Sequence, residues 1–298
     1  MKFAAIDIGS NAIRLLIEEV HVDAGQFHIE KVSLTRVPVR LGEDVFTNGK
    51  ISKNKIQQLI KTMKAFWYLM EVHDIQIVRA CATSAMREAK NRRAVIRKVE
   101  EESNIQIELL SGDEEANLIF SNYFAQNLSA KGNYLYIDVG GGSTELTLIK
   151  NNKRIKGQSF ELGTVRMLSN ATDPKMWEKA RRWIQSSLGA NESITAIGTG
   201  GNINTIFKIA GKKPSQNITA GEIKEQYDSL SKYTIEQRIT KLKMKPDRAD
   251  VIIPACEIYL RLMGYAKIQQ MIVPKIGLAD GIILDLFSKW QLTKKTSK

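Results

Sequence analysis

Two stretches of this sequence combine a carboxylate, a glycine-containing turn and a pair of apolar strands. The first runs from Phe3 to Leu16 and the second from Tyr134 to Leu148. In each, an apolar strand ends in Asp, a polar turn with Gly follows, and an alternating strand returns. Glycine has no Cβ and tolerates positive φ, so consecutive backbone N–H groups can converge on an anion. The pattern predicts two hairpins that bind phosphate.

The two hairpins align with one another without a gap. Asp7 falls on Asp138, and Arg14 falls on Glu145. A single hairpin is weak evidence, because Asp and Gly are ordinary turn residues. Two in register, each opening about half of the chain, indicate two related domains whose turns face one another across a cleft. A chain of 298 residues suits two domains.

Charge and cysteines limit the classes of protein. With 44 Lys and Arg against 32 Asp and Glu, the net charge is +12, which favours polyanionic partners. The alternative is a basic surface that serves solubility alone. Cys81 and Cys256 lack the spacing of a zinc site or a disulfide framework, which indicates a reducing compartment. The opening strand leaves no room for a signal peptide, and no apolar run approaches the ~20 residues of a membrane span. A cytoplasmic protein without membrane contact is expected.

Further candidates lie at strand-to-helix turns. Arg87 follows hydroxyl residues at such a turn, where anions bind, although a solvated helix residue is the simpler interpretation. Ser111 and Glu114 have the spacing of a capping box, which explains Glu114 but leaves Glu115 without a structural task. A carboxylate beside a phosphate site indicates a role in holding metal or orienting water.

The second half of the chain adds a glycine turn and a basic run. The strand at 194–199 runs into Gly200 and Gly201 before a helix, where phosphate can bind. The pattern is not GxGxxG, so a dinucleotide fold is a poor fit. The basic residues from Lys241 to Arg248 are interpreted, taken alone, as a solvated face.

These motifs together resemble the exopolyphosphatase and guanosine pentaphosphate phosphohydrolase (Ppx/GppA) family. The resemblance spans essentially the whole chain. It lies in IDIGSNAIRLLI at 6–17, ATSAMREAKN at 82–91, SGDEEANLIF at 111–120, IDVGGGSTEL at 137–146 and IGTGGN at 197–202. It implies an α/β fold of two ribonuclease H-like domains around a central cleft, in the actin, sugar kinase and chaperone ATPase superfamily. The expected domains are 1–122 and 123–298, with the terminal helix at 282–290 able to pack back on the first.

The resemblance also implies roles for single residues. Glu115 matches the catalytic base that orients or deprotonates the attacking water. Asp138 and Glu145 match acidic positions that hold Mg²⁺ or position water, and Mn²⁺ is the alternative ion. Asp7 matches the first phosphate loop and is expected to be a metal ligand as well. The implied phosphate-binding residues are Ser10, Asn11, Arg14, Arg87, Gly140, Gly141, Gly142, Ser143, Gly200 and Gly201. Ala12 departs from the family, because many members have Ser or Thr there, and the lost hydroxyl puts chain-end binding in question.

The resemblance implies hydrolysis of terminal phosphoanhydride bonds, with release of orthophosphate from inorganic polyphosphate, guanosine pentaphosphate or both. The expected partner is a polyanionic phosphate substrate and not a specific nucleic acid. Two alternatives stay open: a kinase of the same superfamily, and a non-catalytic regulator that binds polyphosphate or alarmone. The sequence does not decide between the two substrates, nor the polyphosphate chain length, the number of metal ions or whether the protein is a homodimer.

Overall fold

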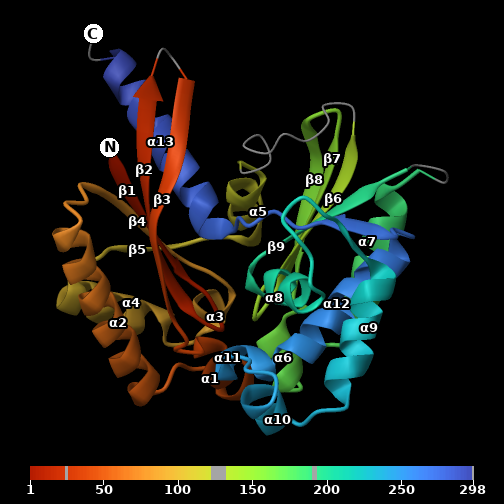
Figure 1. Ribbon diagram of the computed structural model, residues 1–298. Helices are drawn as coiled ribbons and strands as arrows, with labels where there is room; N and C mark the ends of the chain where they lie inside the picture. The colour runs from red at the N-terminus through yellow and green to blue at the C-terminus, as the bar shows by residue number, and fades with distance from the viewer. Residues whose placement is uncertain (24–25, 122–131, 190–192, 297–298) are drawn as a thin grey trace. The chain divides into compact units, whose positions relative to one another are not determined.

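The computed structural model describes residues 1–23, 26–121, 132–189 and 193–296 (Figure 1). The chain divides by its contacts into two compact units. Unit 1 comprises residues 1–125 and 278–298, and unit 2 comprises residues 126–277. The terminal helix is thus counted with unit 1. Within the described ranges, no helix combines the length and the apolar character that crossing a membrane requires.

Unit 1 is a five-stranded mixed sheet covered by helices on both faces. Its strands are β1 (Lys2–Ile8), β2 (Ile13–Asp23), β3 (Gln26–Val37), β4 (Ile77–Ala82) and β5 (Ile107–Leu109). Its helices are α1 (Leu41–Asn48), α2 (Lys53–Val72), α3 (Ser84–Glu88), α4 (Arg92–Ser103), α5 (Gly112–Ser121) and α13 (Leu278–Thr296). The strand order is β3-β2-β1-β4-β5. β1 pairs antiparallel with β2 and parallel with β4.

Unit 2 repeats this sheet and adds one strand. Its strands are β6 (Asn133–Val139), β7 (Thr144–Lys150), β8 (Lys153–Phe160), β9 (Thr195–Thr199), β10 (Ile218–Thr219) and β11 (Gln270–Ile272). Its helices are α6 (Thr164–Leu168), α7 (Lys175–Ser187), α8 (Gly201–Ile209), α9 (Ala220–Ser231), α10 (Ile235–Thr240), α11 (Pro246–Ala249) and α12 (Ile252–Tyr265). The order is β10-β11-β9-β6-β7-β8. The five strands β8-β7-β6-β9-β11 therefore repeat the order of unit 1, and the two-residue β10 is a sixth strand that no sequence pattern predicted.

The duplication extends to irregularities of the two sheets. In unit 1 the register of β2 against β3 shifts between Ile17 and Glu18. In unit 2 the register of β7 against β8 shifts between Leu148 and Ile149, the residues that align with them. A bulge at the same place in both hairpins bends both sheets alike. The predicted fold class of two ribonuclease H-like α/β domains is confirmed.

Strand β1 is buried on both faces because helices cover both. Ala4, Ile6 and Ile8 join the core formed with α2 and α4. On the opposite face, the Phe3 ring lies 6.0 Å from that of Phe287 on α13. Figure 1 shows α2 and α4 on one side of the sheet of unit 1 and α13 along the other. An apolar strand without strict alternation is what burial on both faces requires.

Glu18 is a buried carboxyl on the α13 side of β2, with 5% of its surface exposed. Its pKa is raised to about 7, chiefly by burial and also by the charge of Asp280 on α13, while Lys31 of β3 acts in the opposite direction. Lys31 Nζ lies 3.9 Å from Glu18 Oε1 and 3.0 Å from Asp280 Oδ1. In the unfolded chain the same carboxyl titrates near 4.5. The folded state therefore binds this proton more tightly, and stability is lost as pH rises from about 4.5 to about 7.

Glu18→Gln is expected to remove this loss, because an amide does not ionise. The difference in free energy of unfolding, variant minus wild type, should increase by about 2 kcal/mol from about pH 5 to pH 8. Urea unfolding at both pH values measures the difference. Glu19→Gln, at the half-buried neighbouring position, is the control and should keep the wild-type pH dependence. An E18Q protein whose stability follows pH as the wild type does would contradict the assignment.

Candidate functional site

The first hairpin closes on a tight turn between β1 and β2. Gly9 N donates to Ala12 O at 3.1 Å. Asp7 and Arg14 stand directly opposite one another in the ladder, and their side chains form an ion pair. Asp7 is buried, with 4% of its surface exposed. The pair fixes the guanidinium at the mouth of the turn, while Arg14 keeps donors beyond the one that Asp7 accepts.

Hydrogen bonds from other segments of unit 1 hold this turn in place. Gly42 N donates to Ser10 O at 2.8 Å, and Arg40 N donates to Asn11 O at 3.1 Å. Ala85 N, in the first turn of α3, donates to Ser10 Oγ at 3.2 Å. Both Ser10 and Asn11 are buried. The contacts join the predicted first phosphate loop to α3, the helix that carries Arg87.

Arg87 and Glu115 come together in unit 1 although 28 residues separate them. Arg87 Nη1 donates to Leu110 O at 2.6 Å and lies 3.4 Å from Glu115 Oε2. Glu115 is 7% exposed. The capping box predicted at the start of α5 is present, because Ser111 N donates to Glu114 Oε2 and Glu114 N donates to Ser111 Oγ. Glu114 is thus occupied by the helix end, and Glu115 points instead toward Arg87.

The second hairpin has the register of the first. Gly140 N donates to Ser143 O at 2.9 Å, as Gly9 donates to Ala12. Asp138 stands opposite Glu145, as Asp7 stands opposite Arg14. The gapless alignment read from the sequence is therefore confirmed by the hydrogen bonds of both turns.

Glu145 is held by two hydroxyl groups. Its Oε1 accepts from Ser143 Oγ at 2.7 Å and from Ser159 Oγ at 2.8 Å. The side chain is 3% exposed. Ser159 was not among the predicted residues, and only its pairing with Glu145 across β7 and β8 reveals it.

The same contact explains the departure at Ala12. Ser143 donates to the carboxylate of Glu145, two residues later. The residue two positions after Ala12 is Arg14, whose side chain has only donors and cannot accept from a hydroxyl group. Alanine at position 12 therefore takes no hydrogen-bond donor away from the side chain at position 14.

Helix α6 clamps the glycine loop through its carbonyl oxygens. Thr164 N donates to Gly140 O at 3.1 Å, and Val165 N donates to Gly141 O at 2.8 Å. Arg166, 5% exposed, donates from Nε to Gly142 O at 2.8 Å. Three consecutive carbonyls of the loop therefore point toward α6.

Peptide geometry then fixes where the N–H groups of this loop point. No peptide bond in the described chain is cis, and in a trans peptide the C=O and the following N–H point in opposite directions. The N–H groups of Gly141, Gly142 and Ser143 therefore point away from α6. In the described part of the chain, none of the three donates to a protein acceptor. The loop thus presents three successive backbone donors on the side away from α6, and successive N–H groups of this kind can bind an anion.

The third glycine turn lies beside Asp138. Gly200 has φ +88°, and a Cβ there would lie 2.7 Å from Asp138 Oδ1, so only glycine fits. Asn202 Nδ2 donates to Val139 O at 2.9 Å, and Arg248 Nη1 donates to Asn202 Oδ1 at 2.8 Å. The interpretation of the whole basic run as a solvated face is wrong for Arg248, which is half-buried against this turn.

Tyr259 of α12 braces the strand ends beneath that turn. Its hydroxyl donates to Thr199 O at 3.2 Å, and the side chain is fully buried. Burial raises its pKa well above the ordinary value, and the charge of Asp138 raises the pKa further. Tyr259 therefore stays a neutral hydrogen-bond donor that holds the end of β9.

The sequence profile of the Ppx/GppA phosphatase family matches residues 20–290. The chain belongs to this family. It is 30% identical over 307 residues to the bifunctional 3-dehydroquinate synthase/phosphatase of Fusobacterium nucleatum, covering 95% of this chain and 46% of that protein. It is 28% identical over 314 residues to exopolyphosphatase 2 of Mycobacterium tuberculosis, covering 96% of this chain and 98% of that one. The chain thus spans about half the length of the first relative.

A solved structure shares the fold of this chain. The exopolyphosphatase from Cytophaga hutchinsonii aligns with a TM-score of 0.82 at 22% identity, over 96% of this chain and 98% of that one. At this identity the similarity establishes the architecture alone. The candidate site residues are assigned from the contacts described above.

Two carboxylates of unit 2 suit a magnesium ion. Asp138 and Glu145 stand opposite one another on neighbouring strands, which places their side chains on one face of the hairpin. Among the residues that the structure describes, no three His, Cys, Asp or Glu side chains gather as a metal cluster. Mg²⁺ commonly binds through one or two carboxylates together with substrate phosphates and water, so two carboxylates suffice. Asp7, the third predicted ligand, belongs to unit 1 and pairs with Arg14.

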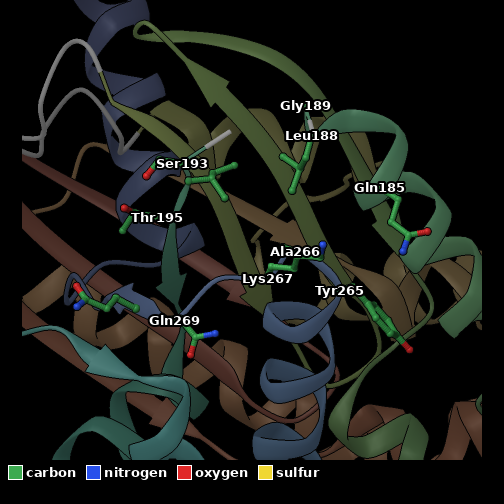
Figure 2. Close-up of a pocket in the computed structure, with 11 residues that line it drawn as sticks. Gln185, Leu188, Gly189, Ser193, Thr195, Tyr265, Ala266, Lys267 and Gln269 are labelled. Carbon is green, nitrogen blue, oxygen red and sulfur yellow. The ribbon is translucent and has the colours of Figure 1, made fainter. Parts of the chain in front are cut away.

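A separate hollow of about 530 Å³ lies at the opposite end of β9 (Figure 2). Its lining includes Gln185, Thr195, Tyr265, Lys267 and Gln269. Thr195 is the first residue of β9, whereas the Gly200 turn follows its last. None of the residues predicted for the Ppx/GppA site lines this hollow, and we do not assign the chemistry to it.

The predicted site residues thus form two sets, one in each unit. The set of unit 1 is Asp7, Ser10, Asn11, Arg14, Arg87 and Glu115. The set of unit 2 is Asp138, Gly140, Gly141, Gly142, Ser143, Glu145, Gly200 and Gly201. That both sets act on one substrate stays a prediction.

Proposed function

We propose that this protein hydrolyses terminal phosphoanhydride bonds and releases orthophosphate from inorganic polyphosphate, from guanosine pentaphosphate, or from both. The observation that carries the proposal is the clamped glycine loop of unit 2, with three N–H groups turned away from α6 beside Asp138 and Glu145. Its support is membership of the Ppx/GppA phosphatase family and the likeness to exopolyphosphatase 2 of Mycobacterium tuberculosis.

The glycine loop would hold the phosphoryl group that is transferred to water. In phosphoryl transfer, catalysis consists largely of positioning and of offsetting charge on the phosphoryl oxygens. Preorganised donors act in this way, and the loss of one such donor typically costs about 10²–10³ in rate. Arg14 and Arg248 would add guanidinium groups, which suit phosphate because their donors form a planar fork.

Glu115 would act on the attacking water. Its carboxylate lies in the first turn of α5 and is oriented by Arg87, which Leu110 O anchors in turn. General-base catalysis of this kind contributes about 10²–10⁴ in rate. Arg87 keeps further donors with which to contact a substrate phosphate.

Mg²⁺, or Mn²⁺ in its place, would be held by Asp138 and Glu145 and would offset charge on the phosphate oxygens. Ser143 and Ser159 would position the Glu145 carboxylate, since both hydroxyls donate to the same oxygen. Glu145 thus has its own supporting hydrogen bonds before any ion arrives.

The direct test is an orthophosphate-release assay with the full chain and Mg²⁺. Long-chain polyphosphate, tripolyphosphate and guanosine pentaphosphate are compared as substrates. Release from at least one is expected. Hydrolysis of the long polyanion should fall most steeply as salt is added, because its many phosphates release their counterions when they bind to basic side chains.

Two other outcomes would replace the proposal. Binding of these polyanions without any orthophosphate release, in Mg²⁺ and in Mn²⁺, would make the protein a regulator. ATP-dependent phosphorylation of a small molecule would make it a kinase of the same superfamily.

A further inference from the structure

The positive charge of this chain is concentrated in unit 2. Unit 2 has 23 Lys and Arg against 13 Asp and Glu, whereas unit 1 has 21 against 19. The net charges are therefore +10 and +2, and unit 2 carries most of the total of +12. A long polyanion is attracted mainly to unit 2.

One segment of unit 2, residues 241–245, carries an unusual density of that charge. Lys241, Lys243 and Lys245 are exposed, and Met244 between them is buried. In the described ranges none of the three lysines forms an ion pair, whereas Lys224 on α9 pairs with Asp228. We call residues 241–245 the basic loop.

A buried arginine gives the basic loop a fixed shape. Arg238, at 7% exposure, donates from Nε to Leu230 O at 3.0 Å and from Nη1 to Ala249 O at 2.9 Å. Met244 N donates to Arg238 O at 3.1 Å. Burial lowers the pKa of Arg238, because a buried guanidinium loses its hydration. The lysines are therefore presented on a braced turn.

The braced turn leads directly to the glycine turn of the proposed site. Arg248 N donates to Lys245 O at 2.9 Å, so the basic loop ends one helical turn before Arg248. Arg248 in turn contacts Asn202, beside Gly201. The short helix α11, which contains Asp247 as well as Arg248, thus joins the basic loop to the Gly200–Gly201 turn.

We propose that the basic loop binds the phosphates of a linear polyphosphate chain that lie beyond the phosphoryl group being cleaved. This inference rests on the proposed function. The ligand class follows from the side chains: Lys is a compact point charge suited to successive phosphates. The basic loop contains no aromatic residue on which a nucleobase would stack.

The test is a triple variant, Lys241→Gln, Lys243→Gln and Lys245→Gln, in the full chain. Its matched control is Lys175→Gln, Lys179→Gln and Lys232→Gln, three exposed lysines of the same unit that form no ion pair in the described ranges. Both variants lose three positive charges, so the long-range attraction of the polyanion to the whole protein is reduced equally in each. Equilibrium binding of long-chain polyphosphate and of tripolyphosphate is measured in EDTA, together with KM and kcat in Mg²⁺.

For the basic-loop variant, the Kd and KM for long-chain polyphosphate should rise about tenfold, with kcat and the affinity for tripolyphosphate unchanged. The slope of log affinity against log salt should become less negative by about two, because three fewer phosphates release their counterions on binding. The control variant should change neither. Equal effects in both variants, or no effect on long-chain binding, would overturn the inference.

The binding measurement separates this inference from the proposed function. If the wild type releases no orthophosphate, the proposed function fails, yet the length-dependent binding still decides for or against the basic loop. If orthophosphate is released and the basic-loop variant binds long and short chains as the wild type does, the inference alone is overturned.

Discussion

Glu115→Gln is expected to lower kcat for orthophosphate release by about 10²–10⁴ while leaving the protein folded. The amide has the shape of the carboxylate and can still accept from Arg87, but it does not take a proton from water. Because we propose that the glycine loop and the basic side chains bind the substrate, KM should change little. Steady-state kinetics on the best substrate of the release assay measures the effect.

Glu114→Gln is the matched control, one residue away in the same helix turn. Glu114 caps α5 through Ser111 and is not directed at Arg87. Its replacement should cost about 1 kcal/mol of stability or less and leave kcat near the wild-type value. Activity retained in E115Q, with normal circular dichroism and unfolding, would remove Glu115 from the catalytic role. Equal losses in both variants would indicate that α5 acts only structurally.

Gly163→Ala should abolish most of the activity by displacing the glycine loop. A Cβ at position 163 would lie 2.3 Å from the carbonyl carbon of Gly142 and 2.4 Å from Gly141 O. These are backbone atoms that cannot rotate away, so the loop or α6 must move. A shift of about 1 Å at a catalytic site can cost about 10²-fold in rate. The overpacking itself should cost about 1–3 kcal/mol of stability.

The control for this variant is Gly264→Ala. Gly264 lies inside α12, and a Cβ there meets nothing within 4 Å. Alanine should stabilise the helix by about 0.5–1 kcal/mol and leave the activity unchanged. The kinetics of both variants are compared with thermal unfolding. A G163A protein with full kcat and KM would show that the position of α6 does not govern the loop.

The local features of this chain followed from its sequence. Both hairpins and the cap at Ser111 are decided by residues within a few positions of one another. Alternation, glycine and capping residues report on such short-range geometry directly. The alignment of the two hairpins also followed from the sequence, because the same order of strand, Asp, glycine turn and strand occurs twice without a gap.

The supporting contacts of the site were decided only by tertiary structure. Ser159 meets Glu145 because of the register of β8, and Arg248 reaches Asn202 from 46 residues away. The direction of the N–H groups in the glycine loop depends on α6, which begins only after β8 has been placed. A sequence gives residue types and spacing, but neither states which distant donor will meet a given carbonyl.

The sequence by itself therefore determined that there are two glycine-containing hairpins, each with its acidic residues, and that a carboxylate stands at Glu115. Tertiary structure decided which groups hold them: α6 behind the glycine loop, Ser143 and Ser159 on Glu145, and Arg87 on Glu115. The physical reason is range. Turn geometry and strand alternation are settled by neighbouring residues, whereas a hydrogen bond between distant segments exists only once the sheet has brought both ends together.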